Sequence, residues 1–456
     1  MTTHIVRTLC LGFLVLVGGC VETDRSISFP SSLDAELRQR LQQWGVVPIG
    51  RPPAQDSARV ALGQALFFDK ILSGNRDIAC ATCHNTPTSM GDGQSLAVGT
   101  GGTGVGPARQ LGPGREFVPR NAPTLLNAGL GLFYMFWDGR ISGHGAGPFF
   151  SPPDVRIPTG VIPNLLAAQA LLPVLNRREM RGERGDVDVF GNPNELAEFL
   201  DSQYLDVWRA IVTRLLAIPE YEAMFRAAFP STHPGTFQIQ HVGTAIAAFL
   251  TAKFTRTDSP FDRYLARDDA ALSAEAKRGA LLFFREAQCA TCHNGALLGG
   301  ERFANVGVPQ IGPGTGPELP LDLGRGGVDP VSQNQFYRFN FRVPPLRNVE
   351  LTAPYMHNGA YATLENVVKH YDDVPLAMQT YDVSQLASQL RAMYHGEPSV
   401  IADMMNNLDF RFRPPLDLTT TEQADLVAFL RSLTDPAARD LSALTPARVP
   451  SGLPVP

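Results

Sequence analysis

The pentapeptide Cys-Ala-Thr-Cys-His occurs twice in this chain, at residues 80–84 and at residues 289–293. Cys-x-x-Cys-His is the attachment signature of c-type haem, in which two thiols bond the porphyrin and the histidine ligates the iron. Two copies therefore predict two covalently bound haem c groups. A zinc knuckle or a disulfide is the alternative reading of one such pair, and a second copy weakens it. The attachment residues are Cys80, Cys83 and His84, and Cys289, Cys292 and His293.

The first 20 residues have the pattern of a secretory signal. Arg7 precedes an apolar run over residues 9–17, which is too short to span a bilayer as a helix. The run ends in Gly18-Gly19-Cys20, which resembles the bacterial lipobox and predicts a lipidated, membrane-anchored Cys20. An ordinary signal peptide cut nearby is the alternative. Export predicts that the protein is located in the periplasm, where haem c is attached. Val21 after the cysteine favours anchoring of the lipidated protein at the outer membrane.

Composition narrows the class of protein further. The formal net charge of −5 gives no general attraction to nucleic acid. The counts of 42 glycines and 37 prolines predict long irregular connections. Of the six cysteines, the two outside the haem motifs, Cys10 and Cys20, lie in the leader, so no structural disulfide is expected.

An internal repeat divides the chain. Gly-Gln-Ala-Leu-Phe-Phe at 63–68 precedes the first haem motif, and Gly-Ala-Leu-Leu-Phe-Phe at 279–284 precedes the second. Each haem motif thus follows a short helix with an apolar face. We predict a mainly α fold of two cytochrome-c-like haem domains with long irregular loops. The predicted parts are a signal peptide (1–20), a tether and lead-in (21–55), an N-terminal haem domain (56–262), a C-terminal haem domain (263–440) and a tail (441–456).

Other helices follow from apolar spacing and caps. Residues 206–228 and 239–254 carry apolar residues at helical spacing. Ser273 with Glu275 is a plausible helix start, and Thr420 with Gln423 resembles a capping box before a further helix. Little of the chain has a strand pattern, and 99–115 and 142–163 are expected to be loops.

Several further segments make the chain resemble the bacterial dihaem cytochrome c peroxidase family, and its MauG-like branch in particular. The resemblance runs from about residue 59 to 433. It implies one haem that transfers electrons, a second with an open distal side that cleaves hydrogen peroxide, and a calcium ion between the domains. It also implies a small redox protein as electron donor, such as a cytochrome c or a cupredoxin, and in some members a homodimer. The segments are 120–127, 136–140, 169–180, 343–348 and 351–359.

The resemblance assigns three residues to the reaction. Glu179 would be the distal acid and base, since cleavage of a peroxide needs a proton taken from one oxygen and given to the other. Gln169 would line the same pocket, and Trp137 would relay electrons between the haems. Without the resemblance, Glu179 would be an exposed partner of the neighbouring arginines, and Trp137 a buried aromatic residue.

The second haem departs from the reductively activated members of the family. They place a Met fourteen residues after the histidine that corresponds to His357, and here that position is Tyr371. A tyrosinate ligand stabilises ferric iron, whereas Met favours the ferrous state. His370 and Met378 are the alternative ligands, and His357 and Arg347 would be groups near this haem.

The first haem departs as well. Those members have a second histidine sixteen residues after the haem histidine, and here that position is Thr100. We therefore expect an open iron site, with His144 as the alternative ligand.

The calcium ion that the family implies would be held by Asn121 and by the carbonyl groups of Thr352 and Pro354, because hard oxygen ligands suit this cation. The alternative is that the segment of Asn121 is only a turn.

Three functions remain open on the sequence. The first is a periplasmic peroxidase that reduces hydrogen peroxide, with electrons passing from the C-terminal to the N-terminal haem. The second is a MauG-like oxidase, in which a high-valent dihaem state oxidises a protein or another organic substrate. The third is a non-catalytic dihaem electron carrier, which would have no need of a distal acid at Glu179.

Overall fold

The computed structural model describes residues 33–143, 147, 157, 162–328 and 335–456. The predicted signal peptide, Cys20, His144 and most of the 142–163 loop lie outside the described residues. Across these ranges, no helix has the length and apolar character needed to cross a membrane.

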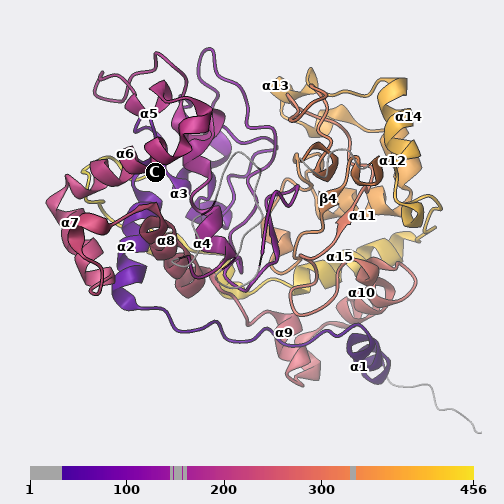
Figure 1. Ribbon diagram of the computed structural model, residues 1–456. Helices are drawn as coiled ribbons and strands as arrows, with labels where there is room; N and C mark the ends of the chain where they lie inside the picture. The colour runs from indigo at the N-terminus through magenta and orange to yellow at the C-terminus, as the bar shows by residue number, and fades with distance from the viewer. Residues whose placement is uncertain (1–32, 144–146, 148–156, 158–161, 329–334) are drawn as a thin grey trace, which may run out of the picture.

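The fold is mainly α-helical, with long irregular connections between the helices (Figure 1). Two pairs of two-residue antiparallel strands, β1 with β2 and β3 with β4, are the named strands in the described ranges. The helices are α1 Leu33–Gln43, α2 Ser57–Phe68, α3 Cys80–Cys83, α4 Leu165–Gln169, α5 Glu195–Glu198, α6 Tyr204–Leu216, α7 Pro219–Ala228, α8 Ile239–Phe254, α9 Pro260–Leu265, α10 Ala274–Phe284, α11 Leu364–Asp372, α12 Val374–Gln379, α13 Ser388–Arg391, α14 Pro398–Asn406 and α15 Thr420–Ser432. The strands are β1 Tyr134–Met135, β2 Ile141–Ser142, β3 Phe303–Ala304 and β4 Phe341–Arg342.

The internal repeat appears as two equivalent helix pairs. α2 packs on α8 in the N-terminal half, and α10 packs on α15 in the C-terminal half. The repeated glycine lies at each crossing, where a Cβ on Gly63 would overlap the carbonyl oxygen of Ala245 and one on Gly279 that of Asp425. Each half therefore builds its own hydrophobic core around a close contact between two helices.

The predicted helices differ in detail from those observed. α8 has the predicted bounds, and Ser273 caps α10 by accepting from the backbone N–H of Ala276. The 206–228 segment is two helices, because Pro219 starts a new one. The cap of α15 is Thr419 with Glu422, one residue earlier than predicted.

The start of the described chain packs on the far half. α1 lies in the predicted lead-in, yet it packs against α10, and its Leu37 and Leu41 belong to the C-terminal core. Lys277 Nζ lies 2.8 Å from Asp34 Oδ1, and Trp44 Nε1 donates to the carbonyl of Phe284 at 2.9 Å. The lead-in thus includes a docked helix.

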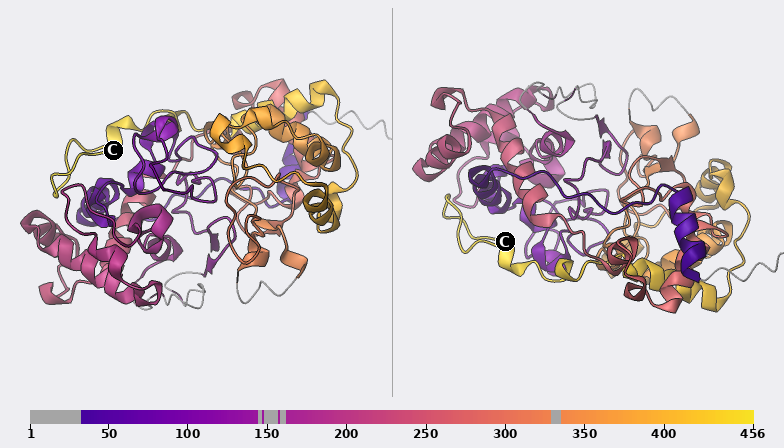
Figure 2. Two further views of the ribbon diagram at one scale, coloured as in Figure 1. Left: turned by 90° about the horizontal axis from the view of Figure 1, so that it is seen from above. Right: turned by 90° about the horizontal axis from the view of Figure 1, so that it is seen from below.

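The C-terminal tail, in turn, packs on the N-terminal half. Residues after Asp435 run back to the N-terminal half, where Figure 2 shows the C-terminus, and Leu441, Val449 and Leu453 enter its core. Buried Asp69, just after α2, accepts hydrogen bonds from Ser451 Oγ at 2.6 Å and Tyr221 OH at 2.7 Å. The two ends of the described chain are therefore exchanged between the two halves.

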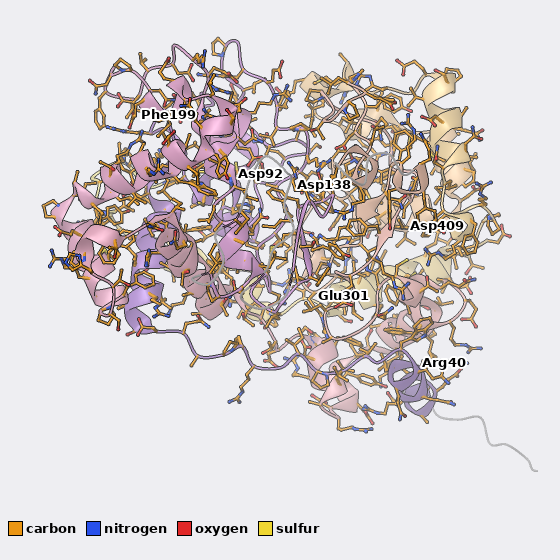
Figure 3. The ribbon with its side chains drawn as sticks, viewed as in Figure 1. Arg40, Asp92, Asp138, Phe199, Glu301 and Asp409 are labelled. Carbon is orange, nitrogen blue, oxygen red and sulfur yellow. The ribbon has the colours of Figure 1, made fainter. Side chains whose placement is uncertain are left out.

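A buried ionic cluster joins the halves at their centre, where Figure 3 labels Asp138. Arg120 donates to Asp138 at 2.5 Å and, through two nitrogens, to Asp322 at 2.7 and 2.8 Å. Arg140 adds a second contact to Asp138 at 3.1 Å. Burial alone would raise the pKa of Asp138, but the charges of Arg120 and Arg140 hold that pKa well below its usual range.

Candidate haem-binding sites

Both haem motifs present their histidine in the same way. α3 carries the first pair of cysteines, and a 3₁₀ turn over Cys289–Thr291 begins the second. The Nδ1 atom of His84 lies 3.1 Å from the carbonyl oxygen of Met90, and Nδ1 of His293 lies 2.9 Å from that of Leu298. A proton on Nδ1 that is shared with a carbonyl leaves Nε2 as a free lone pair, which is the form that ligates a metal.

Burial favours the neutral form of both rings. It lowers the pKa of His293 to about 4 and moves the pKa of His84 in the same direction. Since a protonated imidazole cannot bind iron, both histidines are held in the ligating form at neutral pH.

A large, mostly apolar cavity surrounds the second motif. Cys289, Cys292 and His293 line it together with Tyr371, which comes from α11. The cavity wall also includes Arg347 and His357, so the structure brings together the residues that the sequence assigned to this haem.

The two alternative ligands are engaged elsewhere. His370 accepts from Tyr361 OH at 2.8 Å through Nδ1, and its Nε2 lies 2.7 Å from the carbonyl of Val306. Met378 is buried in a separate apolar cluster with Met404. The geometry therefore favours Tyr371 as the group that faces the second haem, and burial raises the pKa of its phenol.

Several buried nitrogen atoms in the cavity wall fit a haem with two propionates, because they have no hydrogen-bond partner in the described residues. Within the described residues, Arg347 Nη2, Arg342 Nη1 and His357 Nδ1 are buried and have no hydrogen-bond partner. Arg347 is otherwise held by Asp262, at 2.9 Å from Nη1, and Arg342 by the carbonyl of Phe136 at 3.0 Å. Buried guanidinium nitrogens without a hydrogen-bond partner are costly, so the wall is suited to the carboxylates that a bound haem would bring.

Arg342 is a residue that sequence reasoning missed. It lies on β4, and its backbone N–H donates to the carbonyl of Trp137 at 2.7 Å. A lone arginine before Val-Pro-Pro carries no local signal, because its role depends on a contact with a segment about 200 residues earlier.

Near the first haem motif, the predicted acid Glu179 lies beside Thr100, the residue at the position of the second histidine of the reductively activated members. Glu179 belongs to a π-helical turn, Arg177–Arg181, and its Oε1 accepts from Asn176 Nδ2 at 2.9 Å. Thr100 donates its backbone N–H to the carbonyl of Glu179 at 2.8 Å. Val98 lies two residues before Thr100, and its carbonyl oxygen is 3.9 Å from Cys83 Sγ. Glu179 is thus next to the first haem-attachment segment.

Glu179 is half-buried. Its burial raises its pKa, and the charges of Arg140 and Arg120 oppose that rise. The Thr100 hydroxyl donates to Asp77 at 2.8 Å, so its side chain is already paired. A carboxyl group with a raised pKa is better suited than an ordinary one to take up and release a proton during a reaction.

The other two predicted reaction residues, Gln169 and Trp137, lie in different parts of the fold. Gln169 ends α4, and its Oε1 is buried without a partner in the described structure. Trp137 lies between the halves, because its Nε1 donates to the carbonyl of Asn121 at 2.9 Å while it also lines the second haem cavity.

The three residues assigned to calcium also meet. Asn121, Thr352 and Pro354 all lie on the wall of the same cavity. The backbone N–H of Asn121 donates to the carbonyl of His357 at 2.8 Å, which ties the two halves together there. No cluster of three or more His, Cys, Asp or Glu side chains in the described ranges could hold a metal ion, so a calcium site here would depend on amide and carbonyl oxygens.

Two covalent haem c sites, each with a histidine ready to ligate iron, define a dihaem c-type redox protein. The di-haem cytochrome c peroxidase family model matches residues 57–270. The chain is 30% identical over 413 residues to the methylamine utilization protein MauG of Methylorubrum extorquens, covering 90% of this chain and 88% of that protein. It is 33% identical over 343 residues to the cytochrome c551 peroxidase of Pseudomonas aeruginosa, covering 74% and 79%.

The fold has a counterpart among solved structures. A MauG-like protein associated with microbial copper homeostasis aligns with a TM-score of 0.59 and 24% identity, over 88% of this chain and 98% of that one. The chain belongs to the dihaem cytochrome c peroxidase family, and it is a peroxidase-type oxidoreductase. This membership argues against the non-catalytic carrier.

Proposed function

We propose that the protein reduces hydrogen peroxide at its N-terminal haem, with electrons delivered through its C-terminal haem by a small redox protein. The observation that carries this proposal is Glu179, a half-buried carboxyl with a raised pKa beside the first haem-attachment segment. A bound haem supplies the redox chemistry on peroxide. The division into two haem domains, 56–262 and 263–440, is part of the same proposal.

The protein's own groups move the protons. Glu179 takes a proton from the near oxygen of peroxide and returns it to the far oxygen, which leaves as water. Asn176 fixes one carboxyl oxygen at 2.9 Å, so the other is free to face the substrate. Gln169, whose Oε1 is buried and has no hydrogen-bond partner in the described residues, would line the same pocket and accept a hydrogen bond from bound peroxide or water.

Trp137 lies on the proposed electron route between the halves. Its ring is held from the N-terminal half by the Asn121 carbonyl, and its own carbonyl is held from the C-terminal half by Arg342. These two contacts fix the position of the indole relative to both sites. An electron donor, either a cytochrome c or a cupredoxin, would deliver electrons to the C-terminal haem.

A calcium ion is proposed between the halves. Asn121 Nδ2 donates to the carbonyl of Gln94 at 2.6 Å, which leaves Oδ1 to bind a cation together with the carbonyls of Thr352 and Pro354. Its removal by a chelator should lower peroxide turnover and alter the haem spectrum, and added Ca²⁺ should restore both.

A second candidate function is supported by one observation. Tyr371 shares the cavity with His293, and a tyrosinate ligand would favour higher oxidation states of iron over the ferrous state. This is the chemistry of a MauG-like oxidase that acts on a protein or another organic substrate. Its substrate differs from that of the first proposal, since electrons would come from the molecule that is oxidised.

Electron paramagnetic resonance of the oxidised holoprotein tests whether the N-terminal haem has an open site for peroxide. An open N-terminal haem predicts a high-spin ferric signal beside a low-spin one, with the high-spin signal lost on addition of peroxide. Two low-spin signals that ignore peroxide until one electron is added would reveal a hidden ligand, such as His144. That result would contradict the open site and indicate reductive activation.

The secretory signal pattern of the first 20 residues leads us to propose that the protein lies outside the cytoplasm. We expect export to the periplasm and anchoring at the outer membrane through a lipidated Cys20. Replacement of Cys20 by Ser should release the protein from the membrane fraction without loss of haem.

A further inference from the structure

A row of aromatic side chains leads away from the second haem cavity. Tyr371, on the cavity wall, lies next to His370, with 5.5 Å between ring centroids. His370 lies 5.0 Å from Tyr361, Tyr361 lies 5.6 Å from Tyr381, and Tyr381 lies 5.3 Å from Tyr394. Each ring is in contact with the next, so the row is continuous.

The row runs from the interior towards the surface. Tyr361 is only 4% exposed, whereas Tyr381 and Tyr394 are partly exposed. The four segments that supply these rings are α11, the turn before it, the segment after α12 and the segment after α13, so the row is assembled by the tertiary fold. A packing role alone would be served as well by phenylalanine, which lacks a hydroxyl group.

The hydroxyl group of Tyr361 has a partner that can take its proton. Nε2 of His370 lies 2.7 Å from the Val306 carbonyl, and only a protonated Nε2 can bond a carbonyl. Nδ1 is therefore the acceptor of the hydrogen bond from Tyr361 OH, at 2.8 Å. Oxidation of a phenol releases a proton as well as an electron, and this geometry supplies a base in contact with the hydroxyl.

We propose that Tyr361 is a one-electron oxidation site, and that Tyr381 and Tyr394 extend it to the surface, where small phenolic reductants such as hydroquinone donate electrons. This inference rests on the proposed function, because peroxide is the oxidant. It gives the enzyme a second source of electrons besides the redox protein.

The electrons and protons balance. Tyr361 gives one electron towards the oxidised haem centre, and its phenolic proton moves to His370 Nδ1. Tyr381 then reduces Tyr361, which recovers its proton from His370. Tyr381 and Tyr394 are partly exposed, so each releases its phenolic proton to solvent when it is oxidised and takes one up again when it is reduced. Tyr394 refills Tyr381, and the phenolic reductant refills Tyr394 and releases its proton to solvent. Two such electrons and two protons convert one peroxide to two waters.

Freeze-quench electron paramagnetic resonance tests the oxidation site. The holoprotein is mixed with peroxide in the absence of any donor, and a tyrosyl radical is expected, identified by its change on incorporation of deuterated tyrosine. Tyr361→Phe should remove that radical and keep the resting haem spectrum. Tyr264→Phe, a tyrosine on α9 outside the row, should retain the radical.

The surface end has its own test. Tyr394→Phe should retain the radical at Tyr361 but lose most of the rate at which hydroquinone reduces the peroxide-treated protein. Peptide mass spectrometry after repeated peroxide exposure without donor should find oxidation at Tyr394 in the parent protein and little in Tyr361→Phe.

The outcomes distinguish the two proposals. A haem spectrum that responds to peroxide with no tyrosyl radical, or with one that survives in Tyr361→Phe, would refute the inference alone. A haem spectrum that does not respond to peroxide in any redox state would refute the proposed function and, with it, this inference.

Discussion

Replacement of Arg120 by Gln should destabilise the protein strongly, and in a way that depends on pH. Arg120 is the shared partner of Asp138 and Asp322, and all three side chains are buried, at 5–7% exposed. Gln at this position cannot reach both carboxylates or neutralise them. Removal of one partner from a buried ion pair costs about 3–5 kcal/mol, because the remaining charge loses both water and counterion.

The pH dependence follows from the sign of the pKa shifts. With Arg120 present, the pKa values of Asp138 and Asp322 lie below their usual values, so the cluster stabilises the fold above the unfolded pKa and loses that contribution as the pH falls through the folded pKa. Without Arg120, burial raises both pKa values. The two carboxyls then take up protons as the pH is lowered from 7, which relieves the unpaired charges, so the deficit in stability should shrink towards pH 5.

Urea unfolding of the holoprotein, followed by far-ultraviolet circular dichroism at pH 7 and pH 5, measures this deficit. Arg140→Gln is the matched control, because Arg140 has only one contact to Asp138 and its side chain is 30% exposed. Its loss should cost about 1 kcal/mol or less. An Arg120→Gln deficit that is equal at both pH values, or no larger than that of the control, would show that charge burial is not what this cluster contributes.

Three other changes test the sites and the fold. Glu179→Gln should slow the reaction with peroxide, measured by stopped-flow absorbance, by roughly 10²–10⁴-fold. It should also abolish the fall in rate as the pH drops through the raised Glu179 pKa, and an unchanged pH–rate profile would exclude Glu179 as the base. Tyr371→Met should raise the reduction potential of the C-terminal haem in a spectroscopic redox titration, because Met favours ferrous iron, and an unchanged potential would mean that Tyr371 is not a ligand. Gly279→Ala should cost about 3 kcal/mol of unfolding free energy, since its Cβ meets the Asp425 backbone, while Gly50→Ala, in open space, should be near neutral; equal effects would contradict the close helix contact.

The sequence was most informative where the pattern is local. The two pentapeptides, the repeated Gly-to-Phe-Phe segments and the cap at Ser273 lie within a few residues of the structure that they specify. α8 could be predicted for the same reason, as its apolar spacing is continuous. The break before Pro219 was missed because the apolar pattern runs across it.

Features made by distant segments could not be predicted. Nothing near His370 indicates that both its nitrogens are already bonded, since the partners come from Tyr361 and Val306. Arg342 was missed for the same reason. The roles of Glu179 and Tyr371 came from the family resemblance, and their spacing alone would have left them as ordinary helix residues.

The exchanged ends of the chain constrain the order in which the protein can be completed. Leu441, Val449 and Leu453 fill the N-terminal core, and Ser451 bonds Asp69, yet the ribosome makes these residues after the whole C-terminal half. During synthesis the first half therefore lacks part of its interior. The Cys80–Cys83 segment is followed by Thr86, whose hydroxyl oxygen lies 2.8 Å from that of Thr445, so this contact beside the first haem motif also forms only after the C-terminal half has been made.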